Sequence, residues 1–301
     1  MKKTGSTDGG TFNTKARLFG RLIKPTPFYT TGIYNAAHPR LVRVDLSFNT
    51  LPMAFDGFTI LHLTDLHLDF MPELSKRISD LVRGLAPDIC VMTGDYMTGS
   101  RRDGYKTILE PMARIVSAVD ARHGVYATLG NHDTWKMVTP FEAMGIRVLV
   151  NETCRIEKDG QEISITGTDD PHEHYTPDMV RALETAHGEF KLALVHTPEL
   201  YREAQKNGYN LYLAGHTHGG QICLPGGLPL VVHLNKGHRF YRGLWQYGDM
   251  TGYTGQGAGA VGIPIRLNTF SEVTLLTLRA VGKQEHQSSE QKRAIRAKEI
   301  Q

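Results

Sequence analysis

The sequence predicts an α/β or α+β fold, and three observations support this class. Short runs rich in β-branched and other apolar residues alternate with segments whose apolar residues recur every three or four positions. The composition, 40% hydrophobic and 22% charged over 301 residues, is ordinary for a globular protein with a large core. No internal repeat or low-complexity linker interrupts the alternation. We therefore expect one domain with tails.

Eight segments are predicted to be strands because they are short, apolar and rich in β-branched residues. In chain order they are residues 58–64, 88–93, 124–129, 146–150, 163–166, 191–195, 210–214 and 273–278. Helical periodicity predicts four helices, and the last two begin close to a proline. These helices are residues 72–86, 105–121, 177–187 and 198–207.

The two ends of the chain differ in composition from its centre. Residues 11–25 place apolar side chains at helical spacing among lysines and arginines, which makes a small basic amphipathic segment. This segment is either a solvated arm that packs on the domain or a contact with an anionic membrane surface. We assign residues 1–50 to a basic arm and a lead-in strand, residues 51–281 to the globular domain, and residues 282–301 to a polar tail.

Charge and cysteine content argue against several classes of protein. The formal net charge is only +3 and no basic stretch is studded with aromatic residues, so we expect no nucleic-acid partner. The three cysteines, Cys90, Cys154 and Cys223, are odd in number and widely spaced, which argues against a disulfide framework or a structural zinc site. No signal peptide or membrane-spanning run is apparent. We expect a cytoplasmic monomer, peripheral on the inner membrane face if residues 11–25 bind lipid.

Side chains that bind metals or move protons follow five of the predicted strands. They are Asp65, His67, Asp95, Asn131, His132, Asp133, His196, His216 and His218. The loops at the carboxyl ends of strands converge in layered α/β folds, so we expect these side chains to form one site. Mixed nitrogen and oxygen donors suit a first-row divalent ion better than magnesium or calcium. Seven candidate ligands exceed what one open catalytic ion uses, and they suit two ions that share a bridging carboxylate.

The order of these motifs, D-x-H, G-D, G-N-H-D, a separate H and G-H-x-H over residues 65–218, resembles the calcineurin-like metallophosphoesterase superfamily. The resemblance implies a four-layer α/β/β/α sandwich, two packed mixed sheets flanked by helices, with a dinuclear centre between the sheets and residues 51–281 as the metallophosphoesterase domain. It also implies a role for each residue. Asp65, His67 and His218 would bind the first ion, Asn131, His196 and His216 the second, and Asp95 would bridge them, while His132 would act near the leaving group and Asp133 would orient it.

The resemblance implies a hydrolase acting on ester or acid anhydride bonds, a metal-dependent phosphodiesterase or pyrophosphatase. A metal-bridging hydroxide would attack phosphorus in line, and His132 would protonate the leaving oxygen. Two divalent ions are the expected cofactors, with manganese preferred and zinc, iron or magnesium as alternatives.

Three stretches, residues 51–69, 215–226 and 252–278, resemble a bacterial branch of membrane-associated phosphodiesterases that includes UDP-2,3-diacylglucosamine pyrophosphatases. The expected substrate is a phosphate ester, with a nucleotide-linked lipid as one candidate. A phosphomonoesterase or nuclease on the same centre stays an alternative. A non-catalytic, metal-organised scaffold is a remote one, because the ligand set and His132 are complete.

Several further residues receive a structural interpretation. We expect Arg266 to be a surface arginine in a loop, with a place on the substrate side of the cleft as the alternative. We expect Trp135 to pack within its loop, with a stacking platform for a base or a lipid-facing wall as the alternatives. We expect His172 and His174 to lie at the rim of the site. We interpret Cys223 as a small buried hydrophobe and not a nucleophile.

Overall fold

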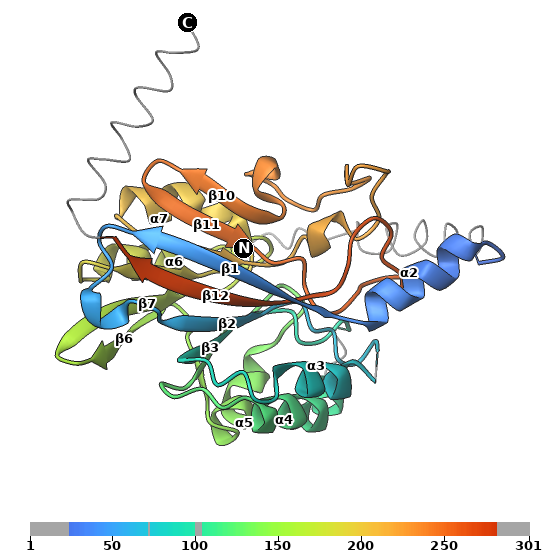
Figure 1. The fold of residues 1–301 in the computed structure, drawn as a ribbon, viewed down its shortest axis with the longest axis horizontal. Coiled ribbons are helices and arrows are strands. Elements are labelled where there is room, and N and C mark those ends of the chain that lie inside the picture. The colour runs from blue at the N-terminus through green and yellow to red at the C-terminus, as the bar shows by residue number, and fades with distance from the viewer. Residues whose placement is uncertain (1–23, 72, 100–103, 282–301) are drawn as a thin grey trace, which may run out of the picture.

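Residues 24–71, 73–99 and 104–281 are described in this computed structural model, and they contain two six-stranded sheets (Figure 1). The first sheet has the order β1 (Arg40–Phe48), β12 (Glu272–Ala280), β2 (Thr59–Leu63), β3 (Ile89–Thr93), β4 (Val125–Thr128) and β5 (Ile146–Val148). The second has the order β10 (Gly243–Tyr247), β11 (Met250–Thr254), β9 (Leu211–Ala214), β8 (Lys191–Leu194), β7 (Gln161–Gly167) and β6 (Glu152–Lys158).

Both sheets are mixed, with a parallel centre. Strands β2 to β5 run parallel in the first sheet, and β7, β8, β9 and β11 run parallel in the second. Antiparallel pairs join β12 to β2, β10 to β11 and β6 to β7. Because parallel neighbours end at the same edge of a sheet, the loops that follow β2, β3 and β4 lie together, as do those that follow β8 and β9.

Helices cover the outer face of each sheet (Figure 1). The first sheet carries α3 (Leu74–Val82), α4 (Leu109–Ala118) and α5 (Val138–Ala143), and the second carries α6 (Pro177–Thr185) and α7 (Tyr201–Lys206). Helix α2 (Pro27–Ala37) leads into β1. The short 3-10 turns are η1 (Met53–Phe55), η2 (Gly104–Ile108), η3 (Trp135–Met137), η4 (Pro198–Leu200), η5 (His218–Gly220) and η6 (His238–Phe240).

Three apolar clusters separate four layers. Leu74, Ile78 and Val82 recur every fourth residue of α3 and pack on the first sheet, as expected of an amphipathic helix. A second cluster fills the space between the sheets, with Val91 on one side and Leu192 on the other. A third lies under α6 and α7. The α/β/β/α sandwich that the sequence predicts is therefore confirmed.

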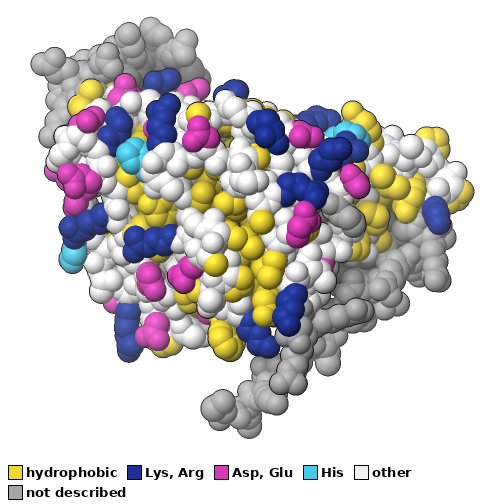
Figure 2. Space-filling model, turned by 90° about the horizontal axis from the view of Figure 1, so that it is seen from below, with side chains coloured by type: hydrophobic (Ala, Val, Ile, Leu, Met, Phe, Trp, Pro, Cys, Tyr) yellow, Lys and Arg dark blue, Asp and Glu magenta, His cyan; other side chains and the backbone are white. Residues whose placement is uncertain are grey.

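The face formed by α3, α4 and α5 is seen from below in Figure 2. Apolar side chains are visible near its centre, and charged side chains of both signs surround them. This mixed surface is ordinary for the solvent face of a helical layer.

All eight predicted strands are present, and their bounds agree with the structure to within two residues. The four predicted helices are present but shorter; 105–121 and 198–207 each begin with a 3-10 turn before α4 and α7. The predicted lead-in strand is β1, whereas β6, β10, β11, α2 and α5 were not predicted. Strand β6 is an edge strand with several exposed charged side chains, so its apolar signal is weak.

The described helices are all too short, or too polar, to cross a bilayer. Of the basic amphipathic segment 11–25, residues 11–23 lie outside the described residues, and so does the polar tail 282–301.

Candidate metal centre

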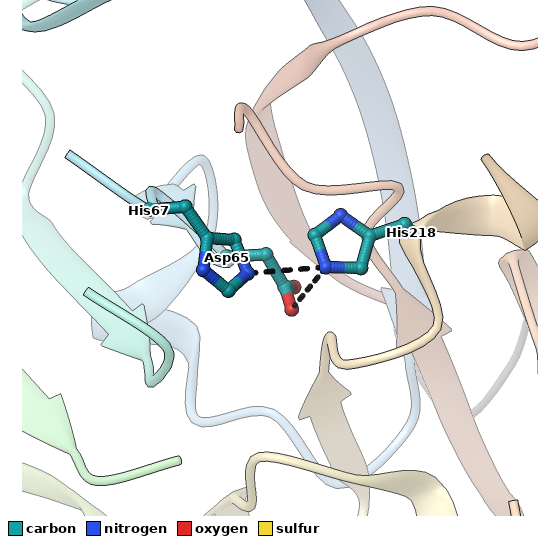
Figure 3. A group of neighbouring side chains, drawn as sticks. All are labelled: Asp65, His67 and His218. Carbon is teal, nitrogen blue, oxygen red and sulfur yellow. Dashed lines mark hydrogen bonds and ion pairs between the residues drawn. The ribbon is translucent and has the colours of Figure 1, made fainter. Parts of the chain in front are cut away.

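The structure brings together the seven side chains predicted to bind metal, and both sheets contribute to each half of the group. Asp65 and His67 follow β2 of the first sheet, and His218 follows β9 of the second. These three form one cluster in which possible ligand atoms lie within 4.8 Å of one another. Figure 3 shows their side chains converging, with 3.2 Å between the Nε2 atoms of His67 and His218. Nε2 of His218 lies 3.5 Å from Oδ1 of Asp65.

A second cluster contains Asp95, which follows β3, together with His196 after β8 and His216 after β9. Nε2 of His196 lies 3.2 Å from Nδ1 of His216 and 3.1 Å from Oδ1 of Asn131, in the loop after β4. The Oδ2 atom of Asp95 lies 3.3 Å from Nε2 of His196 and 3.8 Å from Nε2 of His67. One oxygen atom therefore faces a histidine of each cluster, as a bridging ligand would.

The hydrogen bonds of His196 show that this donor set fits a cation. Its Nδ1 lies 2.7 Å from the carbonyl oxygen of Thr93, so this nitrogen carries a proton and Nε2 of the neutral ring holds a lone pair. That lone pair faces oxygen atoms of Asn131 and Asp95, which also present lone pairs. Facing lone pairs repel unless a cation or a proton lies between them. A histidine that donates its other N–H to a carbonyl is the usual arrangement of a metal ligand.

Burial and the neighbouring charges shift the pKa values of the clustered side chains, some upward and some downward. Burial lowers the pKa of His67 to about 4 and raises that of Asp65 to about 6. Burial alone would lower the pKa of His196, but the carboxylates of Asp95, Asp65 and Asp170 outweigh it and hold this pKa well above 6.5. Burial would raise the pKa of Asp95, yet the neighbouring imidazoles hold it well below its ordinary value. Without metal, a proton on His196 thus takes the place of a cation.

The backbone is strained where it presents these ligands. Ten described residues other than glycine have positive φ, and five of them are predicted ligands. The five are Asp65 (51°), His67 (42°), Asp95 (56°), His216 (72°) and His218 (51°). This conformation is uncommon for residues with a Cβ atom and persists where the surroundings impose it. Side chains at Gly130 and Gly215 would collide with the carboxylates of Asp95 and Asp65, respectively, so these glycines leave room for the ligands.

His132 and Asp133 lie beside the second cluster. The backbone N–H of His132 donates to Oδ1 of Asp95 at 3.0 Å, and its ring centroid is 5.5 Å from that of His67. The Asp133 carboxylate accepts hydrogen bonds from the backbone N–H groups of Asp95, Gly130 and Tyr96 at 2.8, 2.8 and 2.9 Å. Asp133 thus ties two site loops together, and its effect on the His132 ring stays a prediction.

Two structural interpretations made from the sequence were wrong. Arg266 is fully buried, not on the surface, because backbone carbonyl groups surround its guanidinium. Trp135 does not pack within its loop, since its side chain is 76% exposed.

The remaining residues agree with their interpretation or add to it. Cys223 is buried, and burial raises the pKa of its thiol. His174 is exposed, whereas His172 is half-buried with its ring centroid 4.5 Å from that of His216. Sequence reasoning missed Glu199, whose Oε1 lies 2.9 Å from Nδ1 of His172, because a glutamate at the start of a helix is ordinary.

A two-sheet sandwich that gathers imidazole, carboxylate and carboxamide groups at its strand ends defines a protein with a candidate metal centre. Residues 58–220 match the model of the calcineurin-like phosphoesterase family. The chain belongs to this family, which confirms the resemblance found in the motifs.

Three relatives illustrate the range of similar proteins. The chain is 31% identical over 270 residues to a zebrafish transmembrane protein with metallophosphoesterase domain, a match covering 82% of this chain and 59% of the relative. It is 30% identical to the uncharacterized metallophosphoesterase YkuE of Bacillus subtilis, covering 76% and 82%. It is 29% identical to the phosphodiesterase YaeI of Escherichia coli, covering 73% and 82%. The chain thus spans about three fifths of the vertebrate relative's length.

Added Mn²⁺ should stabilise the metal-free protein against heat, and more strongly as the pH is raised from 6 to 8. With its raised pKa, His196 contributes stability in the metal-free fold below pH 6.5, and this contribution is lost as the pH rises through the folded pKa. A metal ligand must be deprotonated, so Mn²⁺ competes with this proton at low pH. At a free concentration of about 100 times Kd the stabilisation is about 2.7 kcal/mol. Thermal melts at several pH values with and without Mn²⁺ measure it; a shift that does not change with pH would contradict the expectation.

Proposed function

We propose that this calcineurin-like phosphoesterase hydrolyses a phosphodiester or pyrophosphate bond with two divalent ions. Asp65, His67 and His218 would hold the first ion. Asn131, His196 and His216 would hold the second, and Asp95 would bridge the two. The observation that carries the proposal is the position of Asp95 Oδ2, 3.3 Å from a histidine of one cluster and 3.8 Å from a histidine of the other. Manganese is the preferred metal, ahead of zinc, iron and magnesium.

The residues of the chain then have distinct chemical tasks. Bound divalent ions would neutralise the phosphate and lower the pKa of the attacking water. Asn131 offers a neutral oxygen and so would hold its ion without cancelling positive charge that the phosphate needs. The half-buried imidazole of His132 would donate a proton to the departing oxygen. Asp133 would hold the loops next to His132 in place, because its carboxylate accepts hydrogen bonds from the backbone N–H groups of Asp95 and Gly130.

A diester, with an apolar group on one side, is the substrate class that we propose. The E. coli relative is named a phosphodiesterase, which supports a diester over a monoester. The segment that follows the His218 turn exposes four apolar side chains, Leu224, Leu228, Leu230 and Val231. Exposed apolar groups close together in the chain favour a lipid-linked substrate, such as a nucleotide-linked lipid, met at the inner membrane surface. Binding of residues 11–25 to anionic lipid stays part of this proposal.

Hydrolysis of bis-p-nitrophenyl phosphate and p-nitrophenyl phosphate by metal-stripped protein tests the reaction class. Manganese, zinc, iron(II) or magnesium is added back separately. We expect turnover that requires metal and is faster for the diester. Faster turnover of the monoester would assign the protein to the phosphatases instead, and no metal-dependent turnover of either compound would contradict this general diesterase activity. Diesters with and without an acyl chain, compared in the same assay, test the lipid-linked substrate.

A further inference from the structure

Arg266 is the largest fully buried side chain in the described residues. It lies in the loop between β11 and β12, and its backbone N–H donates to the carbonyl oxygen of Gly32 in α2 at 2.9 Å. Burial lowers the pKa of its guanidinium to about 10, so it stays charged at neutral pH. A buried charge is costly unless its hydrogen bonds are satisfied, which raises the question of what this side chain holds in place.

The hydrogen bonds of the guanidinium go to backbone carbonyl oxygens from three separate segments. Nη1 donates to His218 at 2.9 Å and to Phe270 at 3.2 Å. Nη2 donates to Gln256 at 2.6 Å, to Gly257 at 3.0 Å and to Gly259 at 2.7 Å. The planar fork of an arginine can satisfy several acceptors at fixed angles in this way, and a lysine has fewer donors to do so.

Two of these segments carry or cover ligands of the first cluster. His218 is itself a predicted ligand with positive φ, and Nη2 of Arg266 also lies 3.4 Å from Nδ1 of its ring. The loop 256–259 covers Asp65, because the N–H of Gly259 donates to the carbonyl oxygen of Asp65 at 2.7 Å. A Cβ atom on Gly257 would lie 2.7 Å from Cβ of Asp65, so loop and ligand are in close contact. In the described part of the chain, the hydrogen bonds of Arg266 reach no ligand of the second cluster.

We propose that Arg266 is a positioning residue of the first metal site, which joins the backbone of His218 to the loop that holds Asp65. The inference rests on the proposed two-metal function and adds that Arg266 supports the binding of the first ion and not of the second. Loss of the guanidinium would release two of the three ligands that belong to the first ion alone and would leave Asn131, His196 and His216 in place. Replacement of groups that support metal ligands typically weakens metal affinity about 10- to 100-fold.

Titration of metal-free protein with Mn²⁺, followed by calorimetry and by electron paramagnetic resonance, tests the proposal without any substrate. The wild type should bind two ions and give the spectrum of a coupled pair. Arg266→Gln should keep one ion at wild-type affinity and bind the other about 10- to 100-fold more weakly. Arg266→Lys keeps the charge and some donors, so its loss should be smaller. Adding His196→Ala to Arg266→Gln should remove the retained ion, whereas adding His67→Ala should not.

Two further variants distinguish a positioning role of Arg266 from general damage to the fold. Gly259→Ala keeps Arg266 but places a methyl group 2.6 Å from the carbonyl oxygen of Asp65, and it should also weaken only one ion. It provides the same comparison if Arg266→Gln does not fold. Arg122→Gln is the matched control, because Arg122 donates to Asp88 at the amino end of β3, at the opposite end of the strands, and both ions should bind normally.

The outcomes separate this inference from the proposed function. Two ions bound with unchanged affinity by folded Arg266→Gln, or an equal loss of both ions, would overturn the positioning role alone. If Arg266→Gln does not fold, the same results for Gly259→Ala would overturn it. A wild-type protein that does not bind two Mn²⁺ ions would overturn the two-metal function, and the positioning role with it.

Discussion

Replacing Asp95 by alanine should reduce metal-dependent hydrolysis of bis-p-nitrophenyl phosphate by at least about 10³-fold, since the two proposed ions would stabilise the transition state by several kcal/mol. The reason lies in the position of one oxygen atom. Oδ2 of Asp95 faces His196 and His67, so its removal would take a negative ligand from both of the proposed ions at once. The two positively charged ions would then repel each other without the Asp95 carboxylate between them. The kcat of the variant at saturating Mn²⁺ measures the effect.

Two other substitutions make this prediction specific. Asp95→Asn keeps the shape and one oxygen donor but loses the charge, so its kcat should lie between those of the wild type and the alanine variant. Asp178→Ala removes an exposed carboxylate on α6 that pairs with Arg181, and it should leave kcat unchanged. An Asp95→Ala variant that retains near-wild-type turnover would show that the bridging assignment is wrong.

Replacing His132 by alanine should slow a diester with an alcohol leaving group by about 10²- to 10⁴-fold, the usual contribution of a general acid. The loss should be much smaller for bis-p-nitrophenyl phosphate, because p-nitrophenolate leaves as a stable anion without a proton. Metal binding should be unchanged, since His132 belongs to neither cluster. The ratio of kcat/KM for the two substrates, measured for wild type and variant, isolates proton donation from any general damage to the site.

His187→Ala is the matched control for this experiment. His187 is an exposed histidine between α6 and the start of β8, at the opposite end of that strand from His196, and its removal should change neither substrate's kcat/KM. Equal losses on both substrates in His132→Ala would contradict a role in protonating the leaving group. They would point to binding of the phosphate instead.

The sequence predicted the strands and the site loops well because both depend on local patterns. A buried parallel strand such as Ile89–Thr93 is apolar in its first four residues and is followed at once by Gly94 and Asp95. Edge strands such as Glu152–Lys158 alternate buried and exposed side chains and carry too few apolar residues to stand out. Helix ends were also placed poorly, because 3-10 turns at Gly104–Ile108 and Pro198–Leu200 have nearly the same pattern as the helices they precede.

What the sequence could not predict were contacts between distant segments. Nothing near Arg266 in the chain indicates that it lies under the carbonyl groups of His218 and Gly259, since a loop arginine is usually solvated. The same holds for Asp133, whose three backbone partners come from two loops. The predicted ligands were easier to identify because each lies in a loop directly after a strand, and the parallel order of those strands brings the loops to one edge.

Each cluster draws ligands from both sheets, and this has a consequence for how the protein matures. His67 and His218 are 151 residues apart in the chain, and Oδ1 of Asp65 also accepts the backbone N–H of His216 at 3.0 Å. Such distant partners meet only after both halves of the sandwich have formed and docked, which is a late event in folding. In a partly folded chain, therefore, neither of the two ligand clusters is complete. Under the proposed function, metal would bind fully only to chains whose two sheets have docked, and a chain with a misdocked second sheet would be inactive.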